Sequence, residues 1–382
     1  MFTYTLEKKD WHARVWTFQT EHWDIKTPVF MPVGTKASVK WINLQDLEEI
    51  WAQIILNNTY HLYLRPWDQT VAHFGWVHEF QNYHKPILTD SGWFQVFSLW
   101  NTKSWESLVK ITEEWVHFRS YQDGSKHYFD AESVMNIQSN LWADIIMAFD
   151  ECAPWESSKQ YARAAMERTH RWAERCVAQW KINNEKRTAN WQYLQALFPI
   201  CQWVVYDDLR AESAQFVSAL DCPGVAIGWL SVGEWKEDMY RTLDVVNQHL
   251  SEDKPRYLMW VGTPVDLIEW IDRGVDMFDC VLPTRIGRHG RAFSSTWDIN
   301  LKNAVHKLSE EPIDNKCQCK ICKNYTRGYI RHLITENEIE WMSMISYHNL
   351  YFIVNLAREA REAILDWKYS NFKAEFYKNL QM

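Results

Sequence analysis

Carboxylate and amide side chains stand where four apolar stretches of the sequence end. Asp90 follows PILT, Asp150 follows ADIIMAF, Gln202 follows ALFPIC and Asp279 follows VDMF. A single aspartate at the end of a strand is usually a turn or cap residue. Several that converge on one site are more typical of catalysis, because neighbouring buried carboxyls have separated pKa values. One carboxylate could then act as a nucleophile while another exchanges protons.

A second set of residues has the spacing of a metal site. Cys317, Cys319 and Cys322 lie in KCQCKICK, and His348 follows Cys322 by 26 positions. Three thiolates and one imidazole complete the tetrahedral shell of zinc and leave no position open for a substrate. The alternative is three unpaired surface thiols. We expect one structural Zn²⁺ per chain, and we expect the other, scattered cysteines to be buried thiols rather than disulfides.

A basic segment follows the last of the four strand ends. TRIGRHGR contains Arg285, Arg288 and Arg291. From Arg285 to Arg331 there are ten Lys or Arg and four Asp or Glu, although the whole chain has a net charge of −8. One basic face on an acidic body suits a polyanion, and guanidinium groups on a flexible loop, which we expect for TRIGRHGR, suit phosphates and base edges. A solvated run of charge is the alternative, but with the metal segment adjacent we expect a nucleic acid partner.

These residues need a scaffold in which strand ends meet. Eight almost continuously apolar stretches alternate with amphipathic helical patterns, as in a parallel sheet buried on both faces. Eight such units close a (β/α)8 TIM barrel, an α/β fold with its active site at the carboxyl ends of the strands. An open doubly wound sheet is the alternative, but no Gly-rich fingerprint follows the first stretch. The predicted strands are 27–33, 52–59, 86–91, 143–151, 196–202, 224–231, 256–262 and 275–283, and the predicted helices between them are 43–51, 132–142, 161–180, 208–220, 239–250 and 264–274.

The prediction divides the chain into three parts. Residues 1–299 form the catalytic barrel, with an inserted β-hairpin near 100–130. Residues 300–350 form a zinc-binding subdomain near the C-terminus, and residues 351–382 form a helical segment that packs on the barrel. The sequence has no run of about 18 apolar residues and no signal peptide, so we expect a cytoplasmic protein without a membrane partner.

Taken in order, these motifs resemble the bacterial queuine/tRNA-guanine transglycosylase family over essentially the whole chain. The family's order and spacing are kept by TPVFMPVGT, NTYHLYLRP, ILTDSG, MAFDEC, RYLM, MFDCVLPTR and the Cys3His set. The resemblance implies a glycosyltransferase that exchanges guanine at the anticodon wobble position of tRNA for a 7-deazaguanine, such as 7-aminomethyl-7-deazaguanine, in queuosine biosynthesis. It also implies a homodimer with contacts in the zinc-binding subdomain.

The resemblance assigns a role to individual residues. Asp279 would attack the ribose C1′ and form a covalent aspartyl–tRNA intermediate, as carboxylates do in retaining glycoside hydrolysis, and Asp90 would be the general base for the incoming base. The purine would be held at its edges by hydrogen bonds and on its faces by apolar side chains. The implied substrate-binding residues are Ser91, Gly92, Trp93, Phe94, Asp150, Gln202, Gly228, Trp229 and Met259. The implied RNA-binding residues are Val261, Gly262, Thr263, Pro264, Asp266, Thr284, Arg285 and Arg288.

Two other functions remain open. An archaeosine-type transglycosylase would modify the D-arm of tRNA, but such enzymes usually carry an additional C-terminal RNA-binding domain. A non-catalytic zinc-containing tRNA-binding subunit would not need both Asp90 and Asp279, which this chain retains.

Tryptophan is unusually frequent and glycine unusually rare. The chain has 24 Trp and 12 Gly, whereas glycine alone usually makes up about 7% of a sequence. Trp93 stands where the resemblance places a glycine, and we expect an indole there to block the purine pocket. Trp172, by contrast, stands where the family has tryptophan. The same exchange recurs at Trp51, Trp67, Trp76, Trp115, Trp142, Trp203, Trp229, Trp260 and Trp270. One cause would explain this pattern: a UGA codon that the organism reads as glycine. We therefore predict glycine at positions 93, 203, 229 and 260 of the natural protein.

Overall fold

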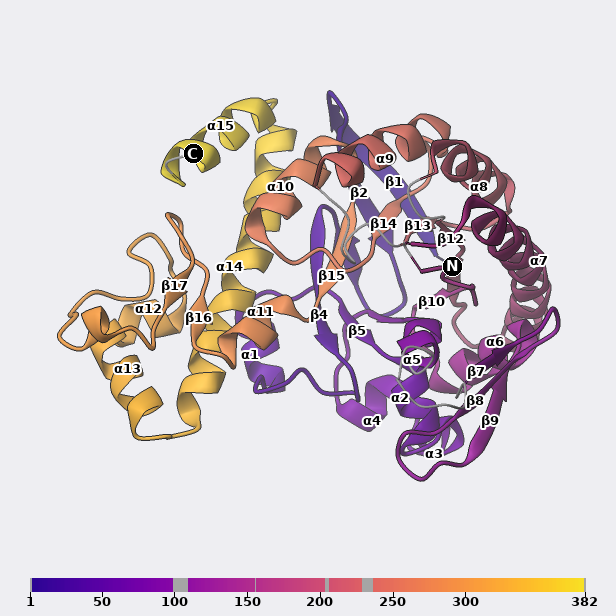
Figure 1. Ribbon diagram of the computed structural model, residues 1–382, viewed down its shortest axis with the longest axis horizontal. Coiled ribbons are helices and arrows are strands. Elements are labelled where there is room, and N and C mark those ends of the chain that lie inside the picture. The colour runs from indigo at the N-terminus through magenta and orange to yellow at the C-terminus, as the bar shows by residue number, and fades with distance from the viewer. Residues whose placement is uncertain (1, 99–108, 155, 203–205, 229–235, 381–382) are drawn as a thin grey trace.

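Short parallel strands close a barrel in which spatial neighbours follow one another along the chain (Figure 1). The computed structural model describes residues 2–98, 109–154, 156–202, 206–228 and 236–380. The last barrel strand pairs with the first through the register Asp279↔Met31, which closes the ring and excludes an open sheet. Pro199 divides one strand into two segments. The barrel strands are β4 (Val29–Gly34), β5 (Ile55–Asn57), β6 (Ile87–Thr89), β10 (Ile145–Met147), β11 (Ala196–Phe198) with β12 (Ile200–Cys201), β13 (Val225–Ile227), β14 (Arg256–Leu258) and β15 (Met277–Cys280).

Helices surround the barrel, and all six predicted helical stretches are confirmed. Their ends are capped as the sequence suggests: Asp130 accepts a hydrogen bond from the backbone N–H of Ser133, and Thr263 accepts one from the N–H of Asp266. The helices are α1 (Leu44–Glu49), α2 (Thr59–Leu64), α3 (Asp68–His73), α4 (Trp76–Gln81), α5 (Trp93–Ser98), α6 (Ala131–Leu141), α7 (Lys159–Ala189), α8 (Asp207–Ala219), α9 (Lys236–His249), α10 (Pro264–Asp272) and α11 (Leu282–Gly287).

An antiparallel sheet that the sequence did not predict packs against the barrel interior. It consists of β1 (Thr3–Asp10), β2 (Ala13–Gln19) and β3 (Asp24–Lys26). Trp16, Phe18 and Ile25 belong to the same buried cluster as the inward-facing barrel residues, so this sheet closes one end of the barrel. Most residues of β1 are exposed, and the polar letters TYTLEKKD give no apolar run from which a strand could be recognised.

The predicted inserted hairpin is part of a three-stranded antiparallel sheet. Its strands are β7 (Val109–Ile111), β8 (Val116–Arg119) and β9 (Lys126–Phe129). The turn at residues 122–125 joins β8 to β9, and Gly124 there has φ +73°. Residues 99–108 lie outside the described part of the chain.

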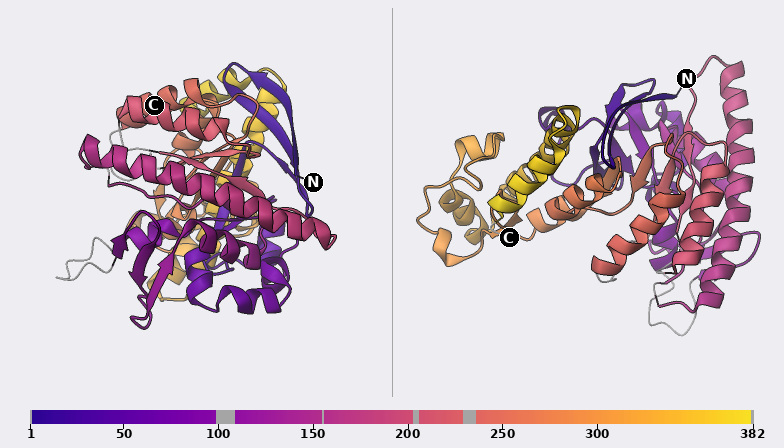
Figure 2. Two further views of the ribbon diagram at one scale, coloured as in Figure 1. Left: turned by 90° about the vertical axis from the view of Figure 1, so that its right-hand side faces the viewer. Right: turned by 90° about the horizontal axis from the view of Figure 1, so that it is seen from above.

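The C-terminal segment forms a small subdomain and two helices that return to the barrel. The subdomain projects from one side of the barrel (Figure 2). Lys320 anchors it to α1 through ion pairs with Asp46 at 2.6 Å and Glu49 at 2.8 Å. Helix α14 crosses residue 350, the predicted boundary, and so connects the subdomain directly to the barrel (Figure 1). The elements are β16 (Arg291–Ala292), β17 (Ile299–Asn300), η1 (Ala304–His306), α12 (Lys320–Asn324), α13 (Arg327–Thr335), α14 (Glu340–Leu365) and α15 (Tyr369–Asn379).

No helix within the described ranges is long and apolar enough to cross a membrane.

Candidate active site and metal centre

The alternation of side chains along the strands places most of the predicted site residues at the barrel mouth. Successive side chains of a strand point to opposite faces, so residues two apart point the same way. The buried interior cluster includes Leu88, Ile200, Ala226, Tyr257 and Met277. Two positions after these residues come Asp90, Gln202, Gly228, Met259 and Asp279. The strand pattern therefore brings residues from five strands to one end of the barrel.

Asp279 is held by two hydrogen bonds at the end of β15. It is 3% exposed, and its Oδ1 atom accepts from the hydroxyl of Tyr257 at 2.6 Å and from the backbone N–H of Trp260 at 3.0 Å. Burial raises the pKa of Asp279 to about 6, and the two hydrogen bonds limit that rise because they stabilise the ionised form. Both bonds fall on Oδ1, which leaves Oδ2 for attack on an electrophile.

Asp90 is held in a different way, by the turn that precedes α2. The backbone N–H groups of Thr59 and Gly92 donate to its Oδ1 atom at 3.0 and 3.1 Å, and the amide of Asn58 donates to Oδ2. Asn58 is also the N-cap of α2, where its Oδ1 accepts from the N–H of His61 at 3.0 Å. The helix cap thus fixes the orientation of the Asp90 carboxyl.

The two aspartates lie close enough to influence each other's ionisation. Burial raises the pKa of Asp90 to about 7, and the negative charge of Asp279 contributes to the rise. Burial and then both carboxylates raise the pKa of Tyr257, which stays a hydrogen-bond donor. Two carboxyls with pKa values of about 6 and about 7 can exchange protons near neutral pH, so one can be a nucleophile while the other transfers a proton.

Asp150 begins a buried chain of hydrogen bonds at the same mouth. Its Oδ1 accepts from the hydroxyl of Ser91 at 3.1 Å, and its Oδ2 accepts from the amide of Gln202. The thiol of Cys152 donates to Oε1 of Gln202 at 2.8 Å. Burial raises the pKa of Asp150 to about 7. This series of hydrogen bonds holds a carboxyl and an amide in fixed orientations, a combination that can bind the polar edge of a heterocycle.

Two glycines of this site, Gly92 and Gly228, are fixed by different contacts. Gly92 has φ +76°, and a Cβ atom there would lie 2.8 Å from the backbone nitrogen of Tyr60, so only glycine fits. Gly228 donates its N–H to the carbonyl of Cys201 at 2.9 Å and accepts from the buried Arg210 guanidinium at 2.9 Å. The carbonyl oxygen of Gly228 can therefore accept one further hydrogen bond, from a ligand.

Trp93 lies in the outer layer of the core and not among the side chains that fill the barrel interior. It is 2% exposed, and its ring packs edge-on against Phe149 at 5.5 Å and Trp172 at 6.2 Å. The expectation that the Trp93 indole blocks a purine pocket therefore receives no support from its position. Met259 is half-buried beside the interior cluster. The side chain of Phe94 and the whole of Trp203 and Trp229 lie outside the described residues.

The predicted RNA-binding residues occupy the starts of two helices that follow β14 and β15. Val261 and Gly262 are buried, Thr263 caps α10, Pro264 is its first residue, and Asp266 accepts from the Thr263 hydroxyl at 2.6 Å. The TRIGR segment was expected to be a flexible loop, and that is wrong. It forms α11, because Gly287 lets this helix pack against α14: a Cβ at 287 would lie 3.0 Å from the backbone of Ser346.

The two arginines of this segment have different environments. Arg285 is exposed, whereas Arg288 is half-buried and donates from Nε to the carbonyl of Thr284, itself buried, at 3.0 Å. The two residues are three positions apart at the end of α11, on the same side of the helix, and burial and then the charge of Arg285 lower the pKa of Arg288. Two neighbouring cations next to Asp279 in the chain suit a phosphate.

The predicted metal ligands come together in the subdomain. The Sγ atoms of Cys317, Cys319 and Cys322 lie 3.7, 3.5 and 3.3 Å from Nδ1 of His348, and all four ligand atoms lie within 4.8 Å of one another. Nε2 of His348 lies 2.8 Å from the carbonyl oxygen of Phe293, which directs Nδ1 towards the sulfurs. The donor set and its orientation fit a metal ion.

A second cluster of possible metal ligands has the geometry of a hydrogen-bonded bridge. His22 Nδ1 lies 2.8 Å from Asp144 Oδ1, and His78 Nε2 lies 3.0 Å from Asp144 Oδ2. The two imidazole rings are stacked 3.6 Å apart and nearly parallel, at 13°. The nitrogens of two parallel rings point in the same direction and do not converge on one point. They therefore suit the two oxygens of one carboxylate better than a single metal ion. Asp144 immediately precedes β10, at the end of the barrel opposite the mouth.

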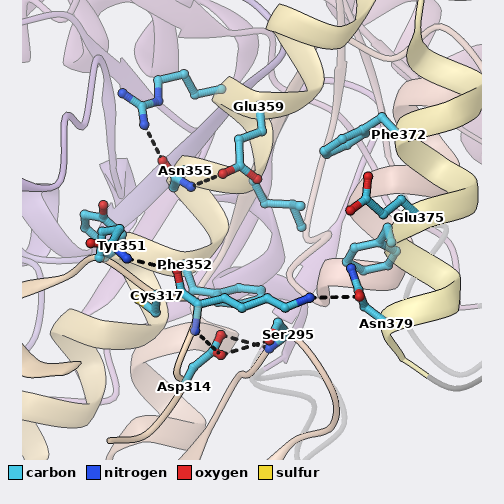
Figure 3. Close-up of a pocket in the computed structure, with 15 residues that line it drawn as sticks. Ser295, Asp314, Cys317, Tyr351, Phe352, Asn355, Glu359, Phe372, Glu375 and Asn379 are labelled. Carbon is cyan, nitrogen blue, oxygen red and sulfur yellow. Dashed lines mark hydrogen bonds between the residues drawn. The ribbon is translucent and has the colours of Figure 1, made fainter. Parts of the chain in front are cut away.

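The groove in Figure 3 lies between the subdomain and the C-terminal helices. It has a volume of about 580 Å³, and its lining includes Cys317 but none of the residues at the barrel mouth. Lys316 donates to the side chain of Asn379 at 2.8 Å across it, and Asp314 accepts from the hydroxyl of Ser295 at 2.8 Å on its wall (Figure 3). The bond from Lys316 connects α15 to the metal segment.

Sequence reasoning missed several residues that support the site. Tyr257, Asn58, Thr59 and Cys152 each bond to a predicted site residue. The parity of the strands could have identified Tyr257, because it precedes Met259 by two positions in a predicted strand. Asn58 and Thr59 carry no such signal, because their role depends on how β5 and β6 lie next to each other.

The closed barrel, the carboxyls at its mouth and the Cys3His cluster define a (β/α)8-barrel enzyme with a metal-binding subdomain. Residues 9–382 match the family described as TGT, queuine tRNA-ribosyltransferase. Proteins named queuine tRNA-ribosyltransferase from Fusobacterium nucleatum, Herpetosiphon aurantiacus and Ruminiclostridium cellulolyticum are 48%, 50% and 51% identical to this chain. The matches cover 98%, 100% and 98% of this chain and 97%, 93% and 97% of those proteins. The chain belongs to the queuine tRNA-ribosyltransferase family and is therefore a pentosyltransferase.

Proposed function

We propose that this protein exchanges guanine at the wobble position of tRNA for a 7-deazaguanine through a covalent aspartyl–tRNA intermediate. The observation that carries the proposal is the pair of carboxyls at the barrel mouth, the half-buried Asp90 and the buried Asp279, whose pKa values of about 7 and about 6 lie near neutrality. A nucleophile and a proton acceptor in one site are what a two-step exchange of bases requires.

In the first step, Oδ2 of Asp279 attacks C1′ of the ribose. The bond between C1′ and N9 of guanine breaks, its electron pair leaves with the base, and the base takes up a proton from solvent water. The transition state has the character of an oxocarbenium ion, so the adjacent carboxylate stabilises it. Tyr257 and the N–H of Trp260 orient the nucleophile through Oδ1.

In the second step, Asp90 removes the N9 proton of the incoming base. The nitrogen electron pair then attacks C1′, and the ester bond to Asp279 breaks and restores the carboxylate. The donors from Thr59, Gly92 and Asn58 keep Asp90 oriented for this transfer. Because the energies of leaving and entering bases are similar, the exchange needs no further co-reactant.

The chain of Ser91, Asp150 and Gln202 supports the assignment of a guanine-type base. A guanine edge carries two N–H donors next to a carbonyl acceptor, which a carboxylate and an amide complement. The other residues assigned to the base are Gly92, Trp93, Phe94, Gly228, Trp229 and Met259, and these assignments are part of the proposal.

For the tRNA we propose the region from Val261 to Asp266 together with Thr284, Arg285 and Arg288. The exposed Arg285 beside the half-buried Arg288 supports a phosphate contact at the mouth. Binding of tRNA should weaken as salt rises, because phosphate contacts release counterions.

We also propose that the Cys3His cluster holds one zinc ion with a structural role, since four protein ligands leave no position for a substrate. A homodimer through the same subdomain remains a proposal. It is supported by the exposed, stacked rings of Tyr325 and Tyr329, whose centroids lie 5.5 Å apart. Sedimentation at several protein concentrations tests the dimer.

The experiment that tests the function is incubation of the protein with tRNA and radiolabelled guanine. We expect label in tRNA at the wobble base. Label at a D-arm position would favour the archaeosine-type reaction, and no label with intact tRNA binding would favour a non-catalytic subunit.

A further inference from the structure

Tryptophan is concentrated at backbone positions that favour glycine. In the described part of the chain, twelve residues other than glycine have positive φ, and nine of them are tryptophan. The left-handed region brings the Cβ atom of an L-residue too close to the following carbonyl oxygen, so bulky residues are rarely found there. The tryptophans are Trp11, Trp41, Trp51, Trp67, Trp76, Trp142, Trp191, Trp260 and Trp367, with φ from +54° to +89°.

Three of these tryptophans close a helix in the manner of a C-terminal glycine. Trp51, Trp191 and Trp367 follow the last residues of α1, α7 and α14. In each case the tryptophan N–H bonds to the carbonyl three residues earlier, and the next N–H bonds to the carbonyl five residues before it. This is the Schellman pattern, whose left-handed residue is usually glycine. Helix α10 ends in the same pattern, with Gly274 at that place and φ +85°.

Four of the nine indole groups are mostly exposed to solvent. Trp11, Trp51, Trp191 and Trp367 are 81, 67, 97 and 64% exposed. At these four positions packing energy cannot explain why a large side chain is kept in a strained backbone conformation. Trp142 differs, because it is 3% exposed and its ring stacks on Tyr193. Trp172 is different: it is fully buried, its Nε1 donates to the carbonyl of Glu113 at 2.6 Å, and its ring stacks on Phe149.

We infer that the nine left-handed tryptophans stand at glycine positions of the natural protein, and that a UGA codon read as glycine by the organism accounts for them. Five of the nine, at 51, 67, 76, 142 and 260, coincide with positions singled out from the sequence. The other four, at 11, 41, 191 and 367, were identified from the backbone alone. Trp93, Trp115 and Trp270 do not have positive φ, so the backbone conformation gives no evidence for glycine at those three positions.

One of the nine is a positioning residue of the reaction, an assignment that rests on the proposed function. Residue 260 has φ +68°, and its N–H donates to Oδ1 of Asp279 at 3.0 Å. The left-handed conformation turns this N–H towards the nucleophile. Glycine at 260 adopts that conformation without strain and holds the carboxylate in place.

The codons and the natural protein test the inference directly. We expect UGA at all nine codons and UGG at codon 172, and we expect peptides of the protein isolated from its own organism to have the mass of glycine at the nine positions. UGG codons, or peptides with tryptophan mass at these positions, would overturn the inference.

Stability gives a second test that does not depend on activity. In the full chain as written, Trp51→Gly, Trp191→Gly and Trp367→Gly should each raise Tm by about 1–3 °C, because backbone strain is relieved. Trp23→Gly and Trp297→Gly are matched controls, because these side chains are also 64 and 57% exposed but have no positive φ. The controls should leave Tm unchanged or lower it. An equal response of both groups would count against the inference.

The role of residue 260 is tested with Trp260→Gly and Trp260→Ala in the exchange assay. Glycine should give a several-fold higher kcat than alanine with little change in KM, and should lower the apparent pKa of the acidic limb of the rate profile, because the bond to Asp279 is better formed. Equal kcat values and pH profiles would reject the positioning role. If neither variant has activity, even with glycine also at positions 93, 203 and 229, the proposed function fails, while the codon and stability results still decide the glycine assignment.

Discussion

The hydroxyl of Tyr257 donates a 2.6 Å hydrogen bond to Oδ1 of Asp279 at the barrel mouth, where the apolar cluster of the interior ends. A buried tyrosine next to a buried carboxyl stabilises the ionised form of the carboxyl and directs its free oxygen. The reactivity of Asp279 should therefore depend on a residue that contributes no chemistry of its own.

Tyr257→Phe should lower the exchange rate about 10- to 100-fold at pH 6, and by less at pH 8. The lost hydrogen bond lets the pKa of Asp279 rise, so the variant needs a higher pH to ionise its nucleophile. The measurement is kcat/KM against pH. Tyr83→Phe is the matched control, because Tyr83 is also buried and bonds through its hydroxyl to the carbonyl of Ala52. An unshifted profile for Tyr257→Phe would contradict the prediction.

Asp90→Asn should separate the two steps of the reaction. Asparagine keeps the shape of the side chain but cannot accept the N9 proton, so we expect the covalent tRNA adduct to form and the incorporation of a new base to fall by at least about 100-fold. Single-turnover assays with labelled tRNA and labelled base measure the two steps independently. Base incorporation at the normal rate would remove Asp90 from the role of general base.

The pH dependence of the unaltered enzyme follows from the same pair. Burial raises the pKa values of Asp90 and Asp279 above their ordinary range, to about 7 and about 6, and both groups act as carboxylates. The rate should therefore fall as the pH is lowered through 7 and then 6, with apparent pKa values that belong to the pair. A rate that stays constant down to pH 5 would be inconsistent with this site.

Cys319→Ser should release the metal and destabilise the subdomain, because metal binding here contributes folding free energy. Elemental analysis and limited proteolysis between residues 300 and 340 are the measurements. Cys222→Ser is the control: Cys222 is buried and belongs to no metal cluster in the described residues. Near one zinc per chain in the Cys319 variant would reject this ligand set.

Asp144→Asn should lower the free energy of unfolding by about 2–4 kcal/mol, since one carboxylate serves His22, His78 and the N–H of Ile87. The hydrogen bonds from the two histidines outweigh burial and lower the pKa of Asp144 to about 2. Because the pKa of Asp144 is lower in the folded protein than in the unfolded chain, its ionisation stabilises the fold at pH values above about 4. This stabilisation is lost as the pH falls towards 2. Denaturant unfolding of variant and wild type at pH 7, where Asp144 is ionised, is the measurement. Equal free energies of unfolding at pH 7 would contradict the bridge.

Much of the fold could be predicted because a parallel strand buried on both faces leaves an apolar run in the sequence. All eight runs are strands of the barrel, and the three aspartates predicted at strand ends, Asp90, Asp150 and Asp279, lie at its mouth. The N-terminal sheet could not be predicted, since β1 is mostly exposed and polar. Asn58 and Thr59, which support Asp90, also escaped prediction, because they come from a neighbouring strand whose register no local pattern contains. The helix α11 was missed because its packing against α14 depends on a contact between Gly287 and Ser346.

The account depends most directly on Asp279 as the nucleophile. Wild-type protein and Asp279→Ala should be incubated with tRNA, denatured and separated on a gel that resolves free from protein-bound tRNA. We predict a covalent band for the wild type and none for the variant, with unchanged Tm and near-unchanged tRNA binding. A covalent band of similar intensity in the Asp279→Ala variant would contradict the account.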